Sequence, residues 1–291
     1  MAPTVTAVVI DNASQDRTLD EVRARSSVRL IANPDNRGFA AAVNQGVRAC
    51  DADDYLLLNP DVYLRTGLEA LVDASERYGL ASGKLVDATG IPQKGFTLRR
   101  FPTPLTLWFE LLGLNRIWPS NPVNRKYRYL DRDLDAEGPV EQPAGAFLMF
   151  RKDVWERLEG LDEGFYPIWF EDVDFCRRAK RKGFQIQYVP RAVAEHEGGH
   201  SVTRLPESCR LRYWCASLLR YAARHFGSAA YRGLCLAVGL TSVPRAVAGM
   251  IREHSISPIF SCIHVIWFAG GRLVSLRRGQ EGSRAKIIKN L

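Results

Sequence analysis

Short apolar runs, each followed at once by polar residues, mark the first two thirds of the chain. The runs lie at residues 5–10, 28–32, 55–58, 143–150 and 185–189. The first of them, at 5–10, is rich in β-branched residues and continuous in hydrophobicity, which is typical of a strand that is buried on both faces of a sheet. Segments with helical spacing of apolar residues alternate with them, at 39–48, 67–78, 152–158 and 171–181. This alternation predicts a doubly wound α/β domain whose ligands bind at the carboxyl ends of the strands.

The C-terminal part has a different pattern. Long helical segments there interleave aromatic and aliphatic residues with arginines, at 211–225 and 231–251. Its charge-free stretches are too short or too interrupted to span a bilayer, at 233–244 and 254–271. We therefore expect an α/β domain over 1–203 and a basic amphipathic helical tail over 204–291 that lies on a membrane surface. Helices packed on the α/β domain, with a solvated basic face, are the alternative.

Composition and charge narrow the class of protein. The 291 residues are 46% hydrophobic and 25% charged, which excludes disordered, collagenous and disulfide-stapled chains. Residues 203–291 hold 14 lysines and arginines against 3 acids, whereas residues 1–202 hold 26 against 29. A basic tail of this kind meets phosphate on a membrane or on nucleic acid. No nucleic-acid-binding motif is visible, so we expect no nucleic-acid partner.

The cysteines and the N-terminus indicate the compartment. The six cysteines form no C-x-x-C pair and have no regular spacing, which argues against a zinc site or a disulfide framework. The chain begins without the basic region and apolar segment of a signal peptide. We therefore expect reduced thiols and a cytoplasmic protein, peripheral at the inner face of the cell membrane.

Polar residues at one strand end suggest cation chemistry. Asn59-Pro60-Asp61 places an amide and a carboxylate two residues apart, directly after the buried run at 55–58. A divalent cation that bridges phosphates needs only one or two protein carboxylates. N-P-D is also an ordinary turn at the end of a strand, so its position alone leaves both interpretations open.

Glu171-Asp172, at the start of a predicted helix, suggests acid–base chemistry. Two acids in a first helical turn compensate the helix dipole and need no other role. Aromatic residues precede them, and these would desolvate a carboxylate and raise its pKa, as a general base requires. Those residues are Phe165, Tyr166, Trp169 and Phe170. Both interpretations stay open at this point.

His196 is the third candidate. It lies in H-E-G-G-H, where the paired glycines oppose the helix that a zinc-binding H-E-x-x-H motif needs. A metallohydrolase is therefore not expected. His196 is either a structural histidine or one further metal ligand.

Seven motifs in a fixed order give these residues a common context. They are I-D-N-A-S-Q-D (10–16), N-x-x-N-R-G-F-A-A-A-V-N-Q-G (33–46), L-L-L-N-P-D (56–61), P-A-G-A-F-L-M-F-R-K-D-V (143–154), G-L-D-E-G-F (160–165), E-D-V-D-F-C-R-R (171–178) and H-x-x-G-x-S (196–201). With them the chain resembles, over roughly residues 5–203, family 2 of the inverting, nucleotide-sugar-dependent glycosyltransferases, and within it the rhamnosyltransferase-like enzymes. The resemblance implies the GT-A fold, a Rossmann-like mixed sheet flanked by helices.

The resemblance also implies roles for individual residues. The residues implied to bind the nucleotide sugar are Asp11, Asn12, Asn36, Arg37, Gly38, Asn44, Asn59 and Asp61. Asp61 and Asn59 stand where the family has its D-x-D motif, and with His196 they would bind Mg²⁺ or Mn²⁺. Asp172, with Glu171 beside it, matches the catalytic base. The residues implied on the acceptor side are Gly145, Ala146 and Trp169.

The implied reaction is one in-line displacement that inverts the anomeric centre. The expected donor is a dTDP- or UDP-sugar, with L-rhamnose from dTDP-L-rhamnose as the first choice. The expected acceptor is a polyprenyl-linked, other lipid-linked or cell-surface glycan, and a homo-oligomer is compatible with this activity. The first strand and helix of the family have no counterpart before residue 5, so we expect weak donor binding by residues 1–291 alone. The alternative is a catalytically inactive family member that serves as a binding or assembly subunit.

Overall fold

The computed structural model describes residues 4–198 and 206–277, which form two compact units. The first unit comprises residues 1–101, 128–163 and 171–198, and the second comprises residues 102–127, 164–170 and 199–291. The division therefore differs from a single boundary near residue 203. Two internal segments, 102–127 and 164–170, belong to the same unit as the C-terminal part. In the first of them, α4 (Pro104–Leu111) packs against α11 (Ser228–Glu253).

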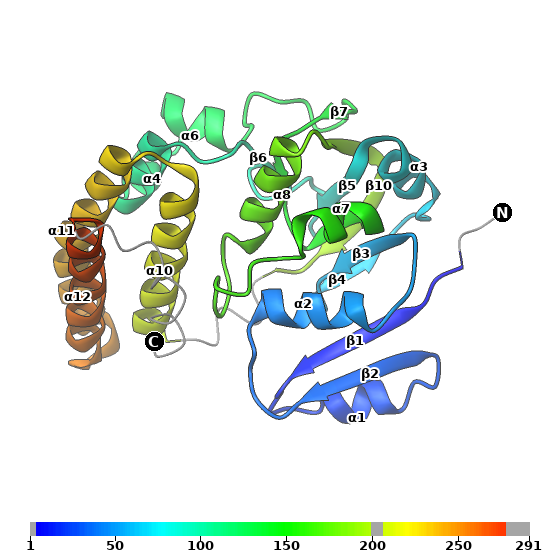
Figure 1. Cartoon of the computed structure of the whole chain (residues 1–291), viewed down its shortest axis with the longest axis horizontal. Coiled ribbons are helices and arrows are strands. Elements are labelled where there is room, and N and C mark those ends of the chain that lie inside the picture. The colour runs from blue at the N-terminus through cyan, green and yellow to red at the C-terminus, as the bar shows by residue number, and fades with distance from the viewer. Residues whose placement is uncertain (1–3, 199–205, 278–291) are drawn as a thin grey trace. The chain divides into compact units, whose positions relative to one another are not determined.

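A mixed sheet forms the centre of the first unit (Figure 1). Its strands lie in the order β3 (Asp54–Leu58), β9 (Phe147–Arg151), β5 (Gly79–Val86), β10 (Gln185–His196) and β4 (Val62–Leu64), and β7 (Gly138–Pro139) pairs with β10. β10 is parallel to β5, whereas β9 is antiparallel to both of its neighbours and β4 is antiparallel to β10.

Helices cover both faces of this sheet. Successive side chains of a strand point to opposite faces, and β9 shows this alternation. Leu148 and Phe150 enter a core shared with α2 (Phe39–Arg48), α7 (Lys152–Leu158) and α8 (Glu171–Arg181). Phe147 and Met149 enter a second core shared with α3 (Glu69–Tyr78). The expected α/β class, a mixed sheet flanked by helices, is confirmed.

The first two strands stand apart from this sheet. β1 (Ala7–Asn12) and β2 (Val28–Asn33) form a parallel pair connected by α1 (Thr18–Arg23). Within the described residues neither strand joins the ladder of the central sheet. The single doubly wound sheet expected from the sequence is therefore divided into two. The pairing still places Asn12 beside Asn33 at the carboxyl ends of both strands.

β10 is longer than the run at 185–189 predicts. Its register against β5 shifts between Val189 and Val193, around Pro190, which has no N–H to donate to the ladder. Beyond the shift the strand continues beside β5 and β4, so that His196 pairs with Val62. A small ladder of β6 (Leu98–Arg99) and β8 (Gln142–Pro143) completes the first unit.

The second unit is helical. Besides α4 and α11 it contains α5 (Leu114–Ile117), α6 (Pro122–Tyr127), α10 (Glu207–His225) and α12 (Ser257–Arg277). Residues Ser228–Arg252 of α11 are long and apolar enough, by length and composition alone, to cross a membrane. An 18-residue window within them has a mean hydropathy of 1.7, and 39% of this window is buried inside the protein. The charge-free stretch 233–244 is too short to span a bilayer, but the helix is longer than this stretch because it continues through Arg232 and Arg245. The basic end at 278–291 lies outside the described residues.

Candidate functional site

Asp61 and His196 meet where β4 pairs with the end of β10. The backbone N–H of Glu197 donates a 3.0 Å hydrogen bond to the Asp61 carbonyl, and Nε2 of His196 lies 3.7 Å from Oδ2 of Asp61. Oδ1 of Asp61 is buried and has no hydrogen-bond partner within the described residues. A buried carboxylate oxygen without a donor, beside an imidazole nitrogen, offers two ligands for a divalent cation.

The imidazole of His196 is held on several sides. Nδ1 lies 2.9 Å from Oε1 of Gln93, and Nε2 of Gln93 donates a 2.8 Å hydrogen bond to the His196 carbonyl. The ring of Phe96 stacks on the imidazole, with 4.7 Å between centroids and 8° between planes. Burial lowers the pKa of His196 and outweighs the raising effect of Asp61, which favours the neutral ring. Sequence reasoning did not single out Gln93 or Phe96.

Asp172, in the first turn of α8, is held by the segment before β9. The backbone N–H of Gly145 donates a 3.0 Å hydrogen bond to Oδ2 of Asp172, and Nε2 of Gln142 lies 3.5 Å from the same atom. Burial raises the pKa of Asp172, while the hydrogen bonds from Gly145 and Val173 and the charge of Arg99 oppose the rise. Arg99 and Gln142 pair with each other across β6 and β8. Both lie in the proline-rich stretch where the sequence pattern gave no signal for them.

Glu171 has a different environment from Asp172. Its side chain is buried, and its Oε2 atom lacks a hydrogen-bond partner in the part of the chain that the structure describes. Burial, followed by the neighbouring charge of Asp172, raises the pKa of Glu171 well above its usual value. A buried carboxyl group in this state favours the protonated form. Asp172 is therefore the better candidate for a base.

The two sets of residues are joined at one end of the strands of the central sheet. Leu58 of β3 pairs with Phe147 of β9, and the ladder extends by the 3.1 Å hydrogen bond from the Asn59 N–H to the Ala146 carbonyl. Asn59 lies two residues before Asp61, and Ala146 follows the Gly145 that binds Asp172. The fold thus places the Asn59-Pro60-Asp61 turn next to the segment that holds the candidate base.

The predicted nucleotide loop forms at the ends of β1 and β2. Asp11 is buried, and its Oδ2 accepts a 3.1 Å hydrogen bond from the Ser14 N–H. Asn12 donates to the Gly38 carbonyl at 3.2 Å, and Oδ1 of Asn36 accepts from the Gly38 N–H at 2.9 Å. Gly38 has a φ of 86°, in the left-handed region that favours glycine, and it precedes α2. Asn36 and its neighbour Arg37 are exposed.

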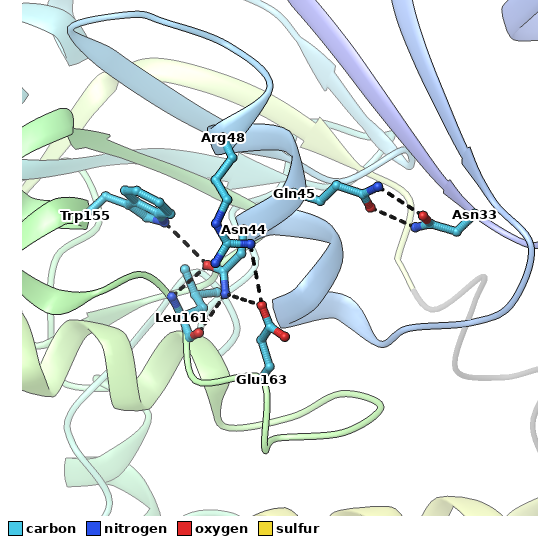
Figure 2. A network of polar contacts seen from close by, with 7 residues as sticks. All are labelled: Asn33, Asn44, Gln45, Arg48, Trp155, Leu161 and Glu163. Carbon is cyan, nitrogen blue, oxygen red and sulfur yellow. Dashed lines mark hydrogen bonds and ion pairs between the residues drawn. The ribbon is translucent and has the colours of Figure 1, made fainter. Parts of the chain in front are cut away.

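Asn44 does not belong to this loop. Its side-chain nitrogen donates to the Leu161 carbonyl at 2.8 Å and to Oε1 of Glu163 at 3.0 Å. Its oxygen accepts from the Leu161 N–H at 2.9 Å and from Trp155 at 3.4 Å (Figure 2). The side chain is 1% exposed and has no polar atom free for a ligand. These contacts brace α2 against residues 161–163, and the role in donor binding implied for Asn44 stays a prediction.

The same helix carries a second amide contact that the sequence did not reveal. Asn33 and Gln45 exchange two hydrogen bonds, at 2.9 and 3.1 Å, so that α2 is tied to the end of β2 (Figure 2). Asn33 also donates to Oδ1 of Asn12 at 2.9 Å. These amides fix the backbone behind the predicted nucleotide loop.

Two of the aromatic residues before α8 have partners on α10. Phe165 and Phe170 contact Arg220 and Tyr221 of α10 within the second unit. Trp169, predicted on the acceptor side, has a φ of 83° and also belongs to the second unit. A bulky residue in the left-handed region is unusual and costs roughly 1–3 kcal/mol.

Comparisons with known proteins find similarity to glycosyltransferases. The family model described as Glycosyl transferase family 2 matches residues 2–158, and the one described as Glycosyltransferase like family 2 matches residues 110–214. The low-salt glycan biosynthesis hexosyltransferase Agl10 of Haloferax volcanii is 26% identical over 208 residues, which cover 69% of this chain and 62% of that protein. The rhamnosyltransferase WbbL of Escherichia coli K12 is 28% identical over 196 residues, covering 65% of this chain and 69% of that protein.

One solved structure illustrates the wider similarity. The mannosyltransferase PcManGT of Pyrobaculum calidifontis, in complex with GDP-Man and Mn²⁺, is 17% identical, with a TM-score of 0.46. The similarity covers 92% of this chain and 70% of that one. The chain thus spans less than two thirds of the length of Agl10 and somewhat more of the other two proteins.

Proposed function

The chain belongs to glycosyl transferase family 2, and on that premise we propose that it transfers a sugar from a nucleoside diphosphate donor to an acceptor hydroxyl with inversion. The observation that carries the proposal is the hydrogen-bonded path from the Asp61 turn, through Asn59 and Ala146, to Gly145 and Asp172. This path places the proposed cation-binding pair and the candidate base at the same end of the strands of one sheet.

Asp172 is the base in this proposal. It accepts the proton of the acceptor hydroxyl while that oxygen attacks the anomeric carbon, and the bond from that carbon to the donor phosphate breaks on the opposite face. The Gly145 N–H and the charge of Arg99 favour the ionised form of Asp172 that this step needs. Glu171, buried and with a raised pKa, is assigned no proton transfer.

Asp61, His196 and Asn59 are the residues that would hold Mg²⁺ or Mn²⁺. The partnerless Oδ1 of Asp61 and the neutral ring of His196 fit such a cation. Within the described residues no group of three or more His, Cys, Asp and Glu side chains could hold a metal by itself, so the donor diphosphate would have to supply further oxygens. When bound, the cation supplies positive charge that stabilises the diphosphate leaving group.

The specific donor and acceptor are a further part of this proposal. We propose dTDP-L-rhamnose as the donor, supported by the 28% identity to the rhamnosyltransferase WbbL, and a lipid-linked or cell-surface glycan as the acceptor. The identity to Agl10, a hexosyltransferase of glycan biosynthesis, supports the transfer of a sugar onto a glycan. Asp11, Asn12, Asn36, Arg37 and Gly38 are the residues proposed to surround the nucleotide.

The experiment that tests this function measures nucleoside diphosphate release by the purified chain. The donors are dTDP-L-rhamnose, UDP-glucose and GDP-mannose, each with a polyprenyl-linked sugar acceptor and with Mn²⁺, Mg²⁺ or EDTA. We expect release from one donor that requires the cation and is lost in Asp61→Asn. Binding of a nucleotide without release from any donor would favour the inactive-subunit alternative instead.

We further propose that the second unit attaches the protein to the cytoplasmic face of a membrane. On α11 the exposed apolar side chains recur at helical spacing, at Leu236, Leu240, Val243, Val247 and Ile251. On α12 the exposed apolar residues include Phe260, Ile263 and Trp267. Apolar side chains on a basic helical unit fit an anionic lipid surface.

Flotation with liposomes tests this attachment. We expect the chain to float with anionic vesicles, less so at high salt, and Leu240→Glu with Ile251→Glu to abolish flotation. Ile117→Glu is the matched control, because Ile117 is 80% exposed but lies on α5. Failure of the unaltered chain to bind vesicles at any salt concentration would exclude attachment by this surface.

A further inference from the structure

Gln93 contacts His196 at two points. Its side-chain oxygen lies 2.9 Å from Nδ1 of the imidazole, and its side-chain nitrogen donates a 2.8 Å hydrogen bond to the carbonyl of the same histidine. The second contact determines the orientation of the amide. A backbone carbonyl only accepts hydrogen bonds, so the NH₂ end of Gln93 must face it and the oxygen end must face the ring.

The amide orientation in turn determines where the imidazole carries its proton. A neutral imidazole has one N–H, and the Gln93 oxygen can only accept, so the proton lies on Nδ1. Nε2 then has a free lone pair. This atom is 3.7 Å from Oδ2 of Asp61, which is longer than a hydrogen bond. Two electron-rich atoms therefore lie near each other with no proton between them.

Gln93 is itself held firmly in place. Its N–H donates to the Leu85 carbonyl at 2.9 Å, and its carbonyl accepts from the N–H and the hydroxyl of Thr97 at 3.0 and 3.1 Å. Leu85 pairs with Ala194, two residues before His196 in β10. Gln93 and His196 are thus fixed to the same pair of strands, and their contact does not depend on a free loop.

We propose that Gln93 is a positioning residue that holds His196 in the Nδ1–H tautomer and so keeps Nε2 available to a cation beside Asp61. This inference rests on the proposed function, because the cation is the one proposed to accompany the donor diphosphate. The other tautomer would point Nε2–H at Oδ2 of Asp61 and close the pair with a hydrogen bond. Histidines that bind metals donate their second N–H to a neighbouring oxygen, and Gln93 supplies that oxygen.

Nitrogen NMR of the full chain reads the tautomer directly, without a metal and without activity. The ring signals of His196 are assigned by their loss in His196→Gln. We expect a protonated Nδ1 and an unprotonated Nε2 in the unaltered chain, and a shift toward protonated Nε2 in Gln93→Leu. Gln93→Glu retains an acceptor and should restore Nδ1–H. Phe96→Leu is the packing control, because it removes the stacked ring and leaves both Gln93 contacts in place.

The second measurement is the affinity for Mn²⁺ in the presence of UDP or dTDP. The electron paramagnetic resonance signal of free Mn²⁺ reports how much of the ion is bound. We expect 10- to 100-fold weaker Mn²⁺ binding in Gln93→Leu, and binding close to that of the unaltered chain in Gln93→Glu. If the unaltered chain binds no Mn²⁺, the proposed cation site fails and the inference fails with it. If it binds Mn²⁺ but its His196 carries the proton on Nε2, or if Gln93→Leu changes neither tautomer nor affinity, only the inference about Gln93 is overturned. The tautomer of the unaltered chain decides the question even where Gln93→Leu folds poorly.

Discussion

The backbone of Gly145 lies directly against the side chain of Asp172. The Gly145 N–H donates a 3.0 Å hydrogen bond to Oδ2 of Asp172, and a Cβ atom built on Gly145 would lie 3.0 Å from Cβ of Asp172. The approach is tight enough that a side chain at position 145 would push Asp172 away by a few tenths of an ångström. The small residues in the P-A-G-A motif thus set the position of the candidate base.

Gly145→Ala should therefore move Asp172 and reduce turnover. The added methyl group would meet the Asp172 side chain and weaken the hydrogen bond from residue 145. We expect kcat to fall about 10- to 100-fold, because small displacements of a reacting group are costly. Gly239→Ala is the matched control, since a Cβ at Gly239 in α11 meets nothing within 4 Å. Equal rates for both variants would show that this contact does not position the base.

Asp172→Asn and Glu171→Gln should have unequal effects on the transfer rate. If Asp172 is the base, Asp172→Asn removes proton acceptance and lowers kcat by roughly 10²- to 10⁴-fold. Glu171→Gln replaces a buried carboxyl group with a raised pKa by a neutral amide of the same shape, so it should retain most of the activity. Transfer rates at saturating donor give the comparison. The reverse order would assign the proton transfer to Glu171.

Glu171→Gln should also change how stability depends on pH. Below the ordinary pKa of 4.5 the carboxyl group is protonated in both the folded and the unfolded chain. As the pH rises above that value, the unfolded chain releases the proton while the fold retains it, so folding stability falls until the raised pKa is passed. Thermal unfolding from pH 4 to pH 8 should show Glu171→Gln gaining stability over the unaltered chain with rising pH. Glu76→Gln, on the exposed side of α3, should show no such gain.

Asn44→Ala should reduce stability more than it affects donor binding. Removal of the amide leaves the N–H and carbonyl of Leu161 without their partner in a buried place, which costs about 2 to 3 kcal/mol. Gln45→Ala, on the same helix, removes the pairing with Asn33 at a half-buried position and should cost less. Urea unfolding measures both. A variant that folds normally but has a strongly raised KM for the donor would support the implied role of Asn44 in donor binding instead.

Several features of the fold follow from local sequence. Apolar periodicity was sufficient for α2, α7 and α8, whose observed bounds coincide with the predicted ones. The strand ends were also informative, because Asp61 and Asn12 lie where apolar runs of the sequence end. Such residues can be found because a strand or a helix is a regular pattern in a short window.

Other features depend on contacts between distant segments and leave no local pattern. Gln93 and His196 are 103 positions apart, and nothing near residue 93 indicates that its amide meets a histidine. Asn44 was predicted on a helix and implied to bind the donor, yet its side-chain partners lie more than a hundred positions later in the chain. The separation of β1 and β2 from the central sheet is equally invisible, because the same apolar run suits either arrangement.

Calorimetric titration with UDP and dTDP, each with and without Mn²⁺, measures whether Asp61 and His196 bind a cation that accompanies a nucleoside diphosphate. We predict that one of the two nucleotides binds the unaltered chain only when Mn²⁺ is present, and that Asp61→Asn and His196→Gln abolish this binding while Glu76→Gln does not. Nucleotide binding that is independent of Mn²⁺ and unchanged in Asp61→Asn would contradict the account.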